Sequence, residues 1–114
     1  MLGKGGHHLF GFGSKVPQIS GADLSAQLAQ DRPPVVIDVR TPAEFRSGHI
    51  AGARLIPLQE LGQRLAEIPK DEQVVTVCHS GSRSQMAARR LKKEGYDVLN
   101  LVGGMMHWAG KKVR

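Results

Sequence analysis

The sequence has only one cysteine, Cys78, among its 114 residues. A single cysteine excludes a disulfide-stabilised secreted scaffold, and it also excludes zinc or iron–sulfur sites that are built from several thiolates. No apolar run approaches the ~20 residues that a transmembrane helix needs, so we expect no membrane-embedded protein. Aromatic residues make up 4% of the chain, and no basic–aromatic alternation of the kind that binds nucleic acid is present. We therefore expect neither a membrane nor a nucleic-acid partner.

The chain length and its first residues predict one domain behind a short tail. Five glycines occur by Gly13, so we predict a flexible, glycine-rich basic tail over residues 1–15 and a single domain over residues 16–114. The tail lacks the continuous apolar segment of a secretory signal, which makes a cytoplasmic location the default expectation. The adjacent histidines His7 and His8 cannot enclose a metal by themselves, and we predict no metal site.

The positive charge of the chain is concentrated in its last third. The formal net charge is +6; residues 1–82 contain eight basic and eight acidic residues, whereas residues 83–114 contain eight basic residues against Glu94 and Asp97 alone. Such a cluster is either a solvated basic helix face or a positive field that gathers small anions or an acidic partner protein. The sequence leaves both interpretations open.

Short β-branched runs alternate with helical periodicity from Val16 onward, which is typical of an α/β fold with a parallel sheet. The run 35–37 is wholly apolar, as expected for a strand that is covered on both faces. We predict strands at 35–37, 55–56, 74–77 and 98–102, and helical segments from Ser20 to Ala29, Pro42 to Phe45, Leu58 to Ile68, Ser84 to Glu94 and around Trp108.

The predicted helix after the third of these strands carries both apolar and basic side chains. We assign Met86, Ala87 and Leu91 to its core face. Its four cations cannot all face the core as well, so we expect them to point to solvent; they are Arg89, Arg90, Lys92 and Lys93.

Cys78 follows the strand 74–77 directly and precedes this helix. Ligands of open α/β sheets bind at the carboxyl ends of the strands, where Cys78 lies. The polar loop 78–83 contains Gly81, and such a loop can turn successive backbone N–H groups inward while the helix N-terminus adds its positive end. These groups favour the reactive thiolate of Cys78, and Arg83 adds a permanent positive charge that can bind an anionic donor.

Several motifs, in order along nearly the whole domain, resemble the rhodanese-type sulfurtransferase family. They are Asp38-Val39-Arg40, Glu44-Phe45-x-x-Gly48-His49-Ile50-x-Gly52-Ala53, Ile56-Pro57, Cys78 through Ser84, Gly95-Tyr96, and Leu101-x-Gly103-Gly104 with Trp108. The resemblance implies a five-stranded parallel sheet flanked by helices on both faces. It also implies that Cys78 is the catalytic cysteine and carries sulfane sulfur as a persulfide, with no metal or organic cofactor.

The resemblance also suggests roles for the residues around the cysteine. Asp38 and Arg40 would anchor the loop region through charge-assisted hydrogen bonds, although a simple surface pair is the alternative. Glu44 and His49 would hold the turn 48–53 together. The loop residues that we expect to bind the donor or the persulfide, besides Arg83, are His79, Ser80, Gly81, Ser82 and Ser84; ordinary turn and capping roles are the alternative for the serines, and a solvent-facing position for His79.

Three function classes follow from these residues. The first is a sulfurtransferase that takes sulfur from thiosulfate or a persulfide donor through Cys78 and passes it to cyanide, a thiol or a carrier protein. The second is a cysteine phosphatase or arsenate reductase, whose loops place five residues between Cys and Arg, whereas this chain has four, His79 to Ser82. The third is a non-catalytic interaction module of the same fold, although inactive members of the family typically lack the cysteine.

Overall fold

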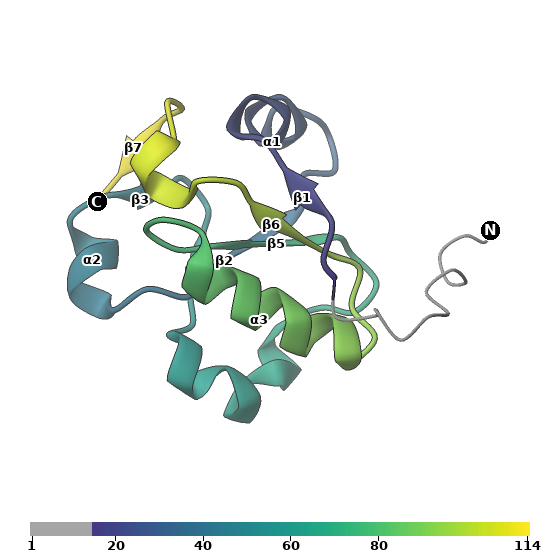
Figure 1. Ribbon diagram of the computed structural model, residues 1–114. Helices are drawn as coiled ribbons and strands as arrows, with labels where there is room; N and C mark the ends of the chain where they lie inside the picture. The colour runs from purple at the N-terminus through teal and green to yellow at the C-terminus, as the bar shows by residue number, and fades with distance from the viewer. Residues whose placement is uncertain (1–14) are drawn as a thin grey trace.

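The computed structural model describes residues 15–114 and contains a five-stranded, wholly parallel sheet (Figure 1). Its strands, in spatial order, are β1 (Gln18–Ile19), β6 (Val98–Leu101), β5 (Val74–Val77), β2 (Val35–Asp38) and β4 (Arg54–Leu55). All residues of β2 and β5 are buried, as their mainly apolar sequences predict, and they include the polar residues Asp38 and Thr76. The predicted fold class is confirmed.

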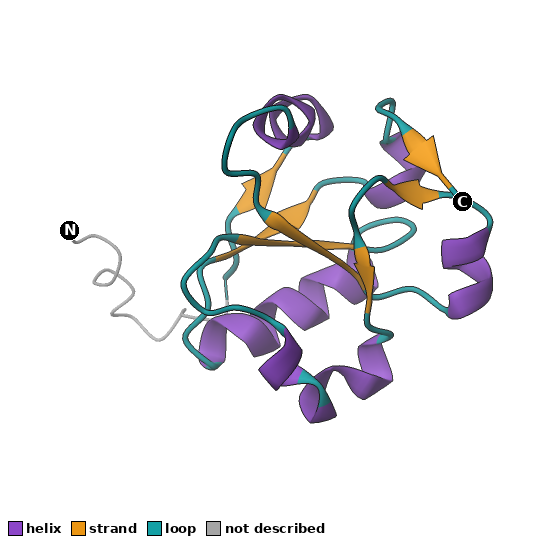
Figure 2. Ribbon diagram, turned by 180° about the vertical axis from the view of Figure 1, so that it is seen from behind, coloured by secondary structure: helices purple, strands orange, loops and turns teal. Residues whose placement is uncertain are grey.

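Helices cover both faces of this sheet (Figure 2). They are α1 (Gly21–Leu28), α2 (Pro42–Arg46), α3 (Ser82–Lys93) and the 3-10 helices η2 (Leu58–Gln63), η3 (Leu65–Glu67) and η4 (Gly104–His107). A separate antiparallel pair joins β3 (His49–Ile50) to β7 (Lys112–Val113). Within residues 15–114, no helix has the length and apolar character that crossing a membrane requires.

The sheet separates two apolar cores. On one face, Val74 and Ile37 pack with Leu91 of α3. On the other, Val75 packs with Leu24 of α1 and with Trp108, which follows η4. The sheet is thus fixed from both sides, and the carboxyl ends of its central strands form a firm base for the loops that follow them.

Capping residues set the starts of α1 and α2. The Ser20 hydroxyl accepts the N–H of Asp23, as the sequence predicts. Thr41 and Glu44 form a complete capping box around Pro42, which occupies the first turn of α2. The capping box within α2 therefore orients the Glu44 side chain independently of contacts with other elements.

Two sequence-based expectations are wrong. The helix predicted from Leu58 to Ile68 is instead the two 3-10 helices η2 and η3, because Gly62 disfavours a continuous α-helix and Arg64 leaves the helical conformation between them. Met86 is 56% exposed rather than part of the core. The buried stripe of α3 is Ser84, Ala87, Ala88 and Leu91, one helix spacing away from Met86.

The tail predicted over residues 1–15 lies, except for Lys15, outside the described residues and stays a prediction, as do the domain boundary and the cytoplasmic location.

Candidate active site

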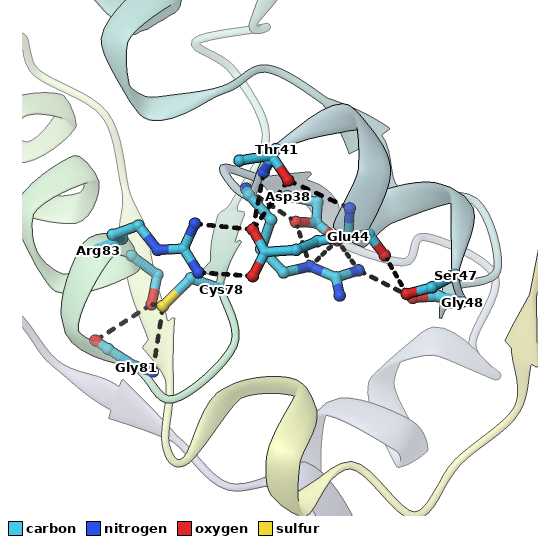
Figure 3. A network of polar contacts seen from close by, with 10 residues as sticks. Asp38, Thr41, Glu44, Ser47, Gly48, Cys78, Gly81 and Arg83 are labelled. Atoms are coloured by element: carbon cyan, nitrogen blue, oxygen red, sulfur yellow. Dashed lines mark hydrogen bonds and ion pairs between the residues drawn. The ribbon is translucent and has the colours of Figure 1, made fainter.

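Cys78 lies at the carboxyl end of β5, and its side chain points into the loop that leads to α3 (Figure 3). The residue is fully buried. Its Sγ accepts the backbone N–H of Gly81 at 3.1 Å and lies 3.3 Å from the Ser84 hydroxyl oxygen. The loop therefore wraps the sulfur with hydrogen-bond donors, as the sequence predicts.

Gly81 gives the loop this shape. Its φ of 109° lies in the left-handed region, and it occupies the N-cap of α3 without a side chain that could cap the helix. A Cβ at this position would lie 3.5 Å from the backbone nitrogen of Gly103. That distance is an ordinary van der Waals contact, so the left-handed backbone of the turn, rather than lack of space, is what favours glycine here.

The environment lowers the pKa of the Cys78 thiol. Burial acts in the opposite direction and raises it, but hydrogen bonds from the Ser84 hydroxyl and from the backbone N–H groups of Ser84, Gly81 and Ser80 outweigh burial. These donors stabilise the negative charge of the thiolate. The hydrogen bonds thus favour the nucleophilic thiolate form of the sulfur.

A buried polar residue of β6 supports this arrangement. The Gly81 carbonyl oxygen lies 3.2 Å from the Ser84 hydroxyl oxygen, but it also accepts the N–H of Gln85 at 3.2 Å and lies 3.5 Å from Nδ2 of Asn100. Because other donors reach this carbonyl, the single proton of Ser84 is free to point toward Cys78. Asn100 is buried and was not identified from the sequence.

Thr76, a buried polar residue of β5, also supports the loop from the sheet. Its hydroxyl donates to the carbonyl of Ser84 at 3.0 Å and fixes the first turn of α3 on the sheet. Thr76 and Asn100 are paired in register between β5 and β6. The signal that could have identified them is a polar residue inside each of two otherwise apolar strands.

Replacing Ser84 by alanine is expected to raise the pKa of the Cys78 thiol. Hydrogen bonds to charged groups contribute about 1.5–3 kcal/mol, so we expect the alkylation rate of Cys78 at neutral pH to fall by about tenfold. The pH dependence of thiolate absorbance and of alkylation measures this change. Ser82→Ala is the matched control, because Ser82 is exposed on the same turn; an equal shift in both variants would contradict the role of Ser84.

Arg83 contacts a carboxylate of the protein itself, whereas the sequence suggested that it binds an anionic donor. Its two Nη atoms donate to the two carboxylate oxygens of Glu44 at 2.8 and 2.9 Å (Figure 3). This fork joins the first turn of α3 to α2. The Glu44 carboxylate thus binds Arg83 and caps α2, and the role that the sequence suggested for Glu44 in the turn 48–53 stays a prediction.

The Arg83–Glu44 pair predicts a loss of stability in acid. The hydrogen bonds from Arg83 lower the pKa of Glu44 from 4.5 to about 2, although burial opposes them. The lowered pKa means that the stabilisation is complete above pH 4.5 and is lost as the pH falls toward about 2. Because the pair is partly exposed, we expect about 1 kcal/mol or less.

Urea unfolding of the wild type and of Arg83→Ala across this pH range measures the contribution. The difference between the two proteins should be largest near neutral pH and vanish at the acid end. Arg32→Ala, an exposed arginine outside the loop region, serves as the control. A difference that does not change with pH would assign the effect of Arg83 to something other than Glu44.

Asp38 and Arg40 form a buried ion pair rather than a surface pair. Asp38 is 1% exposed and Arg40 is 4% exposed. Arg40 donates from Nη2 to Asp38 Oδ2 at 2.7 Å and from Nε to Oδ1 at 2.9 Å, and Nη2 also donates to the carbonyl of Gly48 at 2.9 Å. The pair therefore ties the end of β2 to the end of the α2 segment, which carries Glu44.

His49 lies at the start of β3 and does not contact the sulfur. Its Nδ1 is 2.8 Å from the carbonyl oxygen of Phe45, and its ring stacks on the Phe45 ring with centroids 3.6 Å apart. His49 thus fixes the end of α2, and its supporting role in the turn 48–53 stays a prediction. His79, Ser80 and Ser82 are exposed side chains of the loop.

The chain after β6 closes the site from the other side. The N–H groups of Met105 and Met106 donate to the carbonyls of Cys78 and His79 at 2.8 and 2.9 Å. Gly104 has a φ of 58°, and a Cβ there would collide with both of these carbonyl groups. The sequence signals this approach only through the adjacent glycines 103 and 104.

No group of three or more metal-ligating side chains occurs within residues 15–114. The donors around Cys78 are N–H and O–H groups, which suit a sulfur anion. The arrangement can hold a nucleophilic sulfur and stabilise negative charge on an atom that is bound to it.

Comparisons with known proteins agree with this geometry. A profile of the rhodanese-like domain matches residues 20–111. A sulfurtransferase of Allochromatium vinosum is 43% identical over 95 residues, which cover 82% of this chain and 89% of that protein. The Bacillus subtilis protein YrkF, named as a candidate sulfur carrier, is 40% identical over 111 residues; these cover 96% of this chain but 60% of the length of YrkF.

A solved structure supports the same fold and family. The crystal structure of a rhodanese-like domain protein from Staphylococcus aureus superimposes with a TM-score of 0.80 at 32% identity, over 84% of this chain and 94% of that one.

Proposed function

We propose that this chain, which belongs to the rhodanese-like domain family, is a sulfurtransferase that carries sulfane sulfur as a persulfide on Cys78. The relatives that are named sulfurtransferases support rhodanese-type sulfur transfer. The observation that supports this proposal most directly is the buried Cys78 sulfur, which accepts hydrogen bonds from Gly81 and Ser84 and whose pKa is lowered. We further propose thiosulfate as a donor, because it offers a reactive outer sulfur on a stable leaving group.

The first half-reaction loads the enzyme. The Cys78 thiolate attacks the outer sulfur of thiosulfate, a new S–S bond forms, and the S–S bond of the donor breaks. Sulfite leaves with the electron pair of that bond, so that no external oxidant or reductant is needed. The outer sulfur of the resulting persulfide carries the negative charge, and the loop N–H groups stabilise it.

The second half-reaction returns the enzyme to its initial state. A nucleophilic acceptor, such as cyanide, a thiolate or a cysteine of a carrier protein, attacks the outer sulfur of the persulfide. The Cys78–sulfur bond breaks and Cys78 leaves as a thiolate in the same hydrogen-bonded position. The two half-reactions share one site, which is the basis of ping-pong kinetics.

We propose that the main role of Arg83 is to hold α2 beside the Cys78 loop. Two of its N–H groups are committed to Glu44, and the pair fixes α2 beside the mouth of the loop. The remaining guanidinium N–H groups can still donate to the sulfonate end of a donor, while the Glu44 carboxylate offsets most of the positive charge. The loop residues His79, Ser80, Ser82 and Ser84 complete the proposed donor site.

The phosphatase and arsenate-reductase interpretation has less support. The loop places four residues between Cys78 and Arg83, and in this structure the Arg83 fork binds Glu44. The alternative of a non-catalytic interaction module stays open only if Cys78 is never loaded with sulfur.

Intact mass measurement after incubation with thiosulfate tests the proposed function. We expect the mass of one added sulfur atom, which cyanide or dithiothreitol removes, and release of one sulfite per loaded protein. Protein that never gains sulfur from thiosulfate or from a small persulfide, but turns over a phosphate ester, would instead support the phosphatase interpretation.

A further inference from the structure

Two side-chain amides connect the edge strand β1 to the Cys78 loop. Gln18 of β1 is paired in register with Asn100 of β6, the neighbouring strand (Figure 1). Nδ2 of Asn100 donates to Oε1 of Gln18 at 3.0 Å and lies 3.5 Å from the carbonyl oxygen of Gly81. Gln18 is exposed, whereas Asn100 is only 3% exposed. The connection therefore runs from the surface of the sheet edge to the buried side of the loop.

The backbone of β1 fixes the orientation of both amides. Nε2 of Gln18 donates to the carbonyl of Val16 at 3.1 Å and to Oε1 of Gln85 at 2.8 Å. Because a carbonyl oxygen can only accept, the amide nitrogen of Gln18 has to lie on that side, and its oxygen faces Asn100. Asn100 in turn has to present its nitrogen, since the reversed amide would place its oxygen against two acceptors, the Gln18 oxygen and the Gly81 carbonyl.

This orientation decides which acceptor the Ser84 hydroxyl uses. The carbonyl oxygen of Gly81 has two lone pairs, and the backbone N–H of Gln85, at 3.2 Å, and the side-chain N–H of Asn100 can occupy both. The Ser84 hydroxyl oxygen lies 3.2 Å from this carbonyl oxygen and 3.3 Å from Sγ of Cys78. Because the two distances are nearly equal, it is the occupied carbonyl that leaves the sulfur as the acceptor.

We propose that Asn100 and Gln18 are positioning residues for sulfur transfer. By occupying the Gly81 carbonyl, Asn100 directs the proton of the Ser84 hydroxyl to the sulfur, and Gln18 holds Asn100 in the orientation that this requires. Both residues thus act on Cys78 through Ser84. The inference deepens the proposed sulfurtransferase function and rests on that function for its effect on turnover.

The connection consists of uncharged side chains, so its replacement leaves the charges around the sulfur in place. The charged or titratable side chains of the segments that adjoin the loop are His79, Arg83, Glu44, Asp38, Arg40 and His107. The variants described below retain all of them. A change in the pKa of Cys78 in these variants therefore reports hydrogen bonding rather than charge.

The pH dependence of Cys78 alkylation tests the proposal on protein that carries no added sulfur. Asn100→Leu keeps the approximate size of the side chain but removes its donor, and we expect alkylation at neutral pH to be about threefold slower than in the wild type. At a pH where the thiol is fully ionised, the two proteins should react at the same rate, because the substitution raises the pKa and leaves access to the sulfur unchanged. Gln18→Leu should act in the same direction with a smaller effect, since Asn100 then keeps its amide but loses the acceptor that orients it.

The double variant Asn100→Leu with Ser84→Ala shows whether Asn100 acts through Ser84. Without the hydroxyl there is no proton to direct, so Asn100→Leu should slow alkylation no further in the Ser84→Ala background. Gln85→Ala is the matched control, because its side chain contacts the nitrogen of the Gln18 amide, which Val16 also holds. The backbone N–H of Gln85 is retained, and this control should react like the wild type.

The outcomes decide between positioning and a purely structural role. Equal alkylation of the wild type and Asn100→Leu at every pH, or the same loss of rate with and without the Ser84 hydroxyl, would overturn the proposal. A slower reaction that persists where the thiol is fully ionised would do so as well, because it would show altered access to the sulfur. If Asn100→Leu fails to give the circular dichroism spectrum of the wild type, the exposed Gln18→Leu decides, and an unchanged alkylation profile in that variant counts against the proposal.

Sulfur loading from thiosulfate separates this inference from the proposed function. Alkylation needs no sulfur donor, so it reports the positioning role whether or not the protein transfers sulfur. Loading at neutral pH, followed by intact mass, should be slowed in Asn100→Leu by the same factor as alkylation. Wild-type protein that alkylates as expected but gains no sulfur from thiosulfate or a small persulfide would overturn the proposed function, whereas loading that Asn100→Leu leaves unchanged would overturn the role of Asn100 in turnover.

Discussion

Replacement of Cys78 by alanine is expected to reduce sulfur transfer to the background rate. The chain has no second cysteine that could replace the nucleophile, and every donor that the loop directs at this position would then surround an empty site. Incubation with thiosulfate should add no sulfur to the variant, as measured by intact mass, and release no sulfite. A sulfur adduct or turnover in Cys78→Ala would contradict the assignment of Cys78.

Folding of the variant is the necessary control. The change removes one buried sulfur atom, so we expect a loss of only about 1–2 kcal/mol in the free energy of unfolding. Cys78→Ser keeps an atom that can accept the Gly81 N–H, but its hydroxyl is a weak nucleophile at neutral pH. Both variants should show the circular dichroism spectrum of the wild type, and neither should transfer sulfur.

Replacement of Arg40 by methionine is expected to have the largest effect on stability. Asp38 is 1% exposed and receives its charged hydrogen bonds from Arg40, so its carboxylate would be left buried without a counter-ion. Breaking a buried ion pair in this way costs about 3–5 kcal/mol. Urea unfolding at neutral pH measures the loss.

The double variant Asp38→Leu with Arg40→Met separates charge from packing. It removes the unpaired carboxylate, so it should be more stable than Arg40→Met alone. Arg46→Met, on the exposed last residue of α2, should change stability by less than about 0.5 kcal/mol. A single Arg40→Met variant as stable as Arg46→Met would show that the buried pair does not anchor the loop region.

The sequence predicted the central part of the fold and of the site because strong local signals encode both. The strands 35–37 and 74–77, the helix start at Ser20, and the position of Cys78 after a strand each depend on a few neighbouring residues. The same is true of the glycine in the loop after Cys78. Patterns of this kind fix the element and the residue without knowledge of distant contacts.

The errors concern features that depend on contacts between distant segments. The Arg83–Glu44 pair joins residues 39 positions apart, and no local pattern distinguishes Glu44 from Asp38 as the partner. The two-residue strands β1, β3 and β7 exist because they pair with other strands, so propensity alone does not show them. Met86 was misassigned because an apolar residue on a helix was equated with burial.

The hydrogen bonds from η4 to the carbonyls of Cys78 and His79 bear on the energetics of turnover. A peptide group is planar, and its N–H points opposite to its C=O. With the His79 carbonyl held by Met106, the N–H of Ser80 is turned toward the sulfur, where it helps to lower the pKa of Cys78. In the proposed sulfur transfer, negative charge that moves between the inner and outer sulfur would therefore meet dipoles that are already oriented. Little reorganisation energy remains to be supplied in either half-reaction, and the tandem glycines after β6 make this rigidity possible by letting the backbone of η4 come so close.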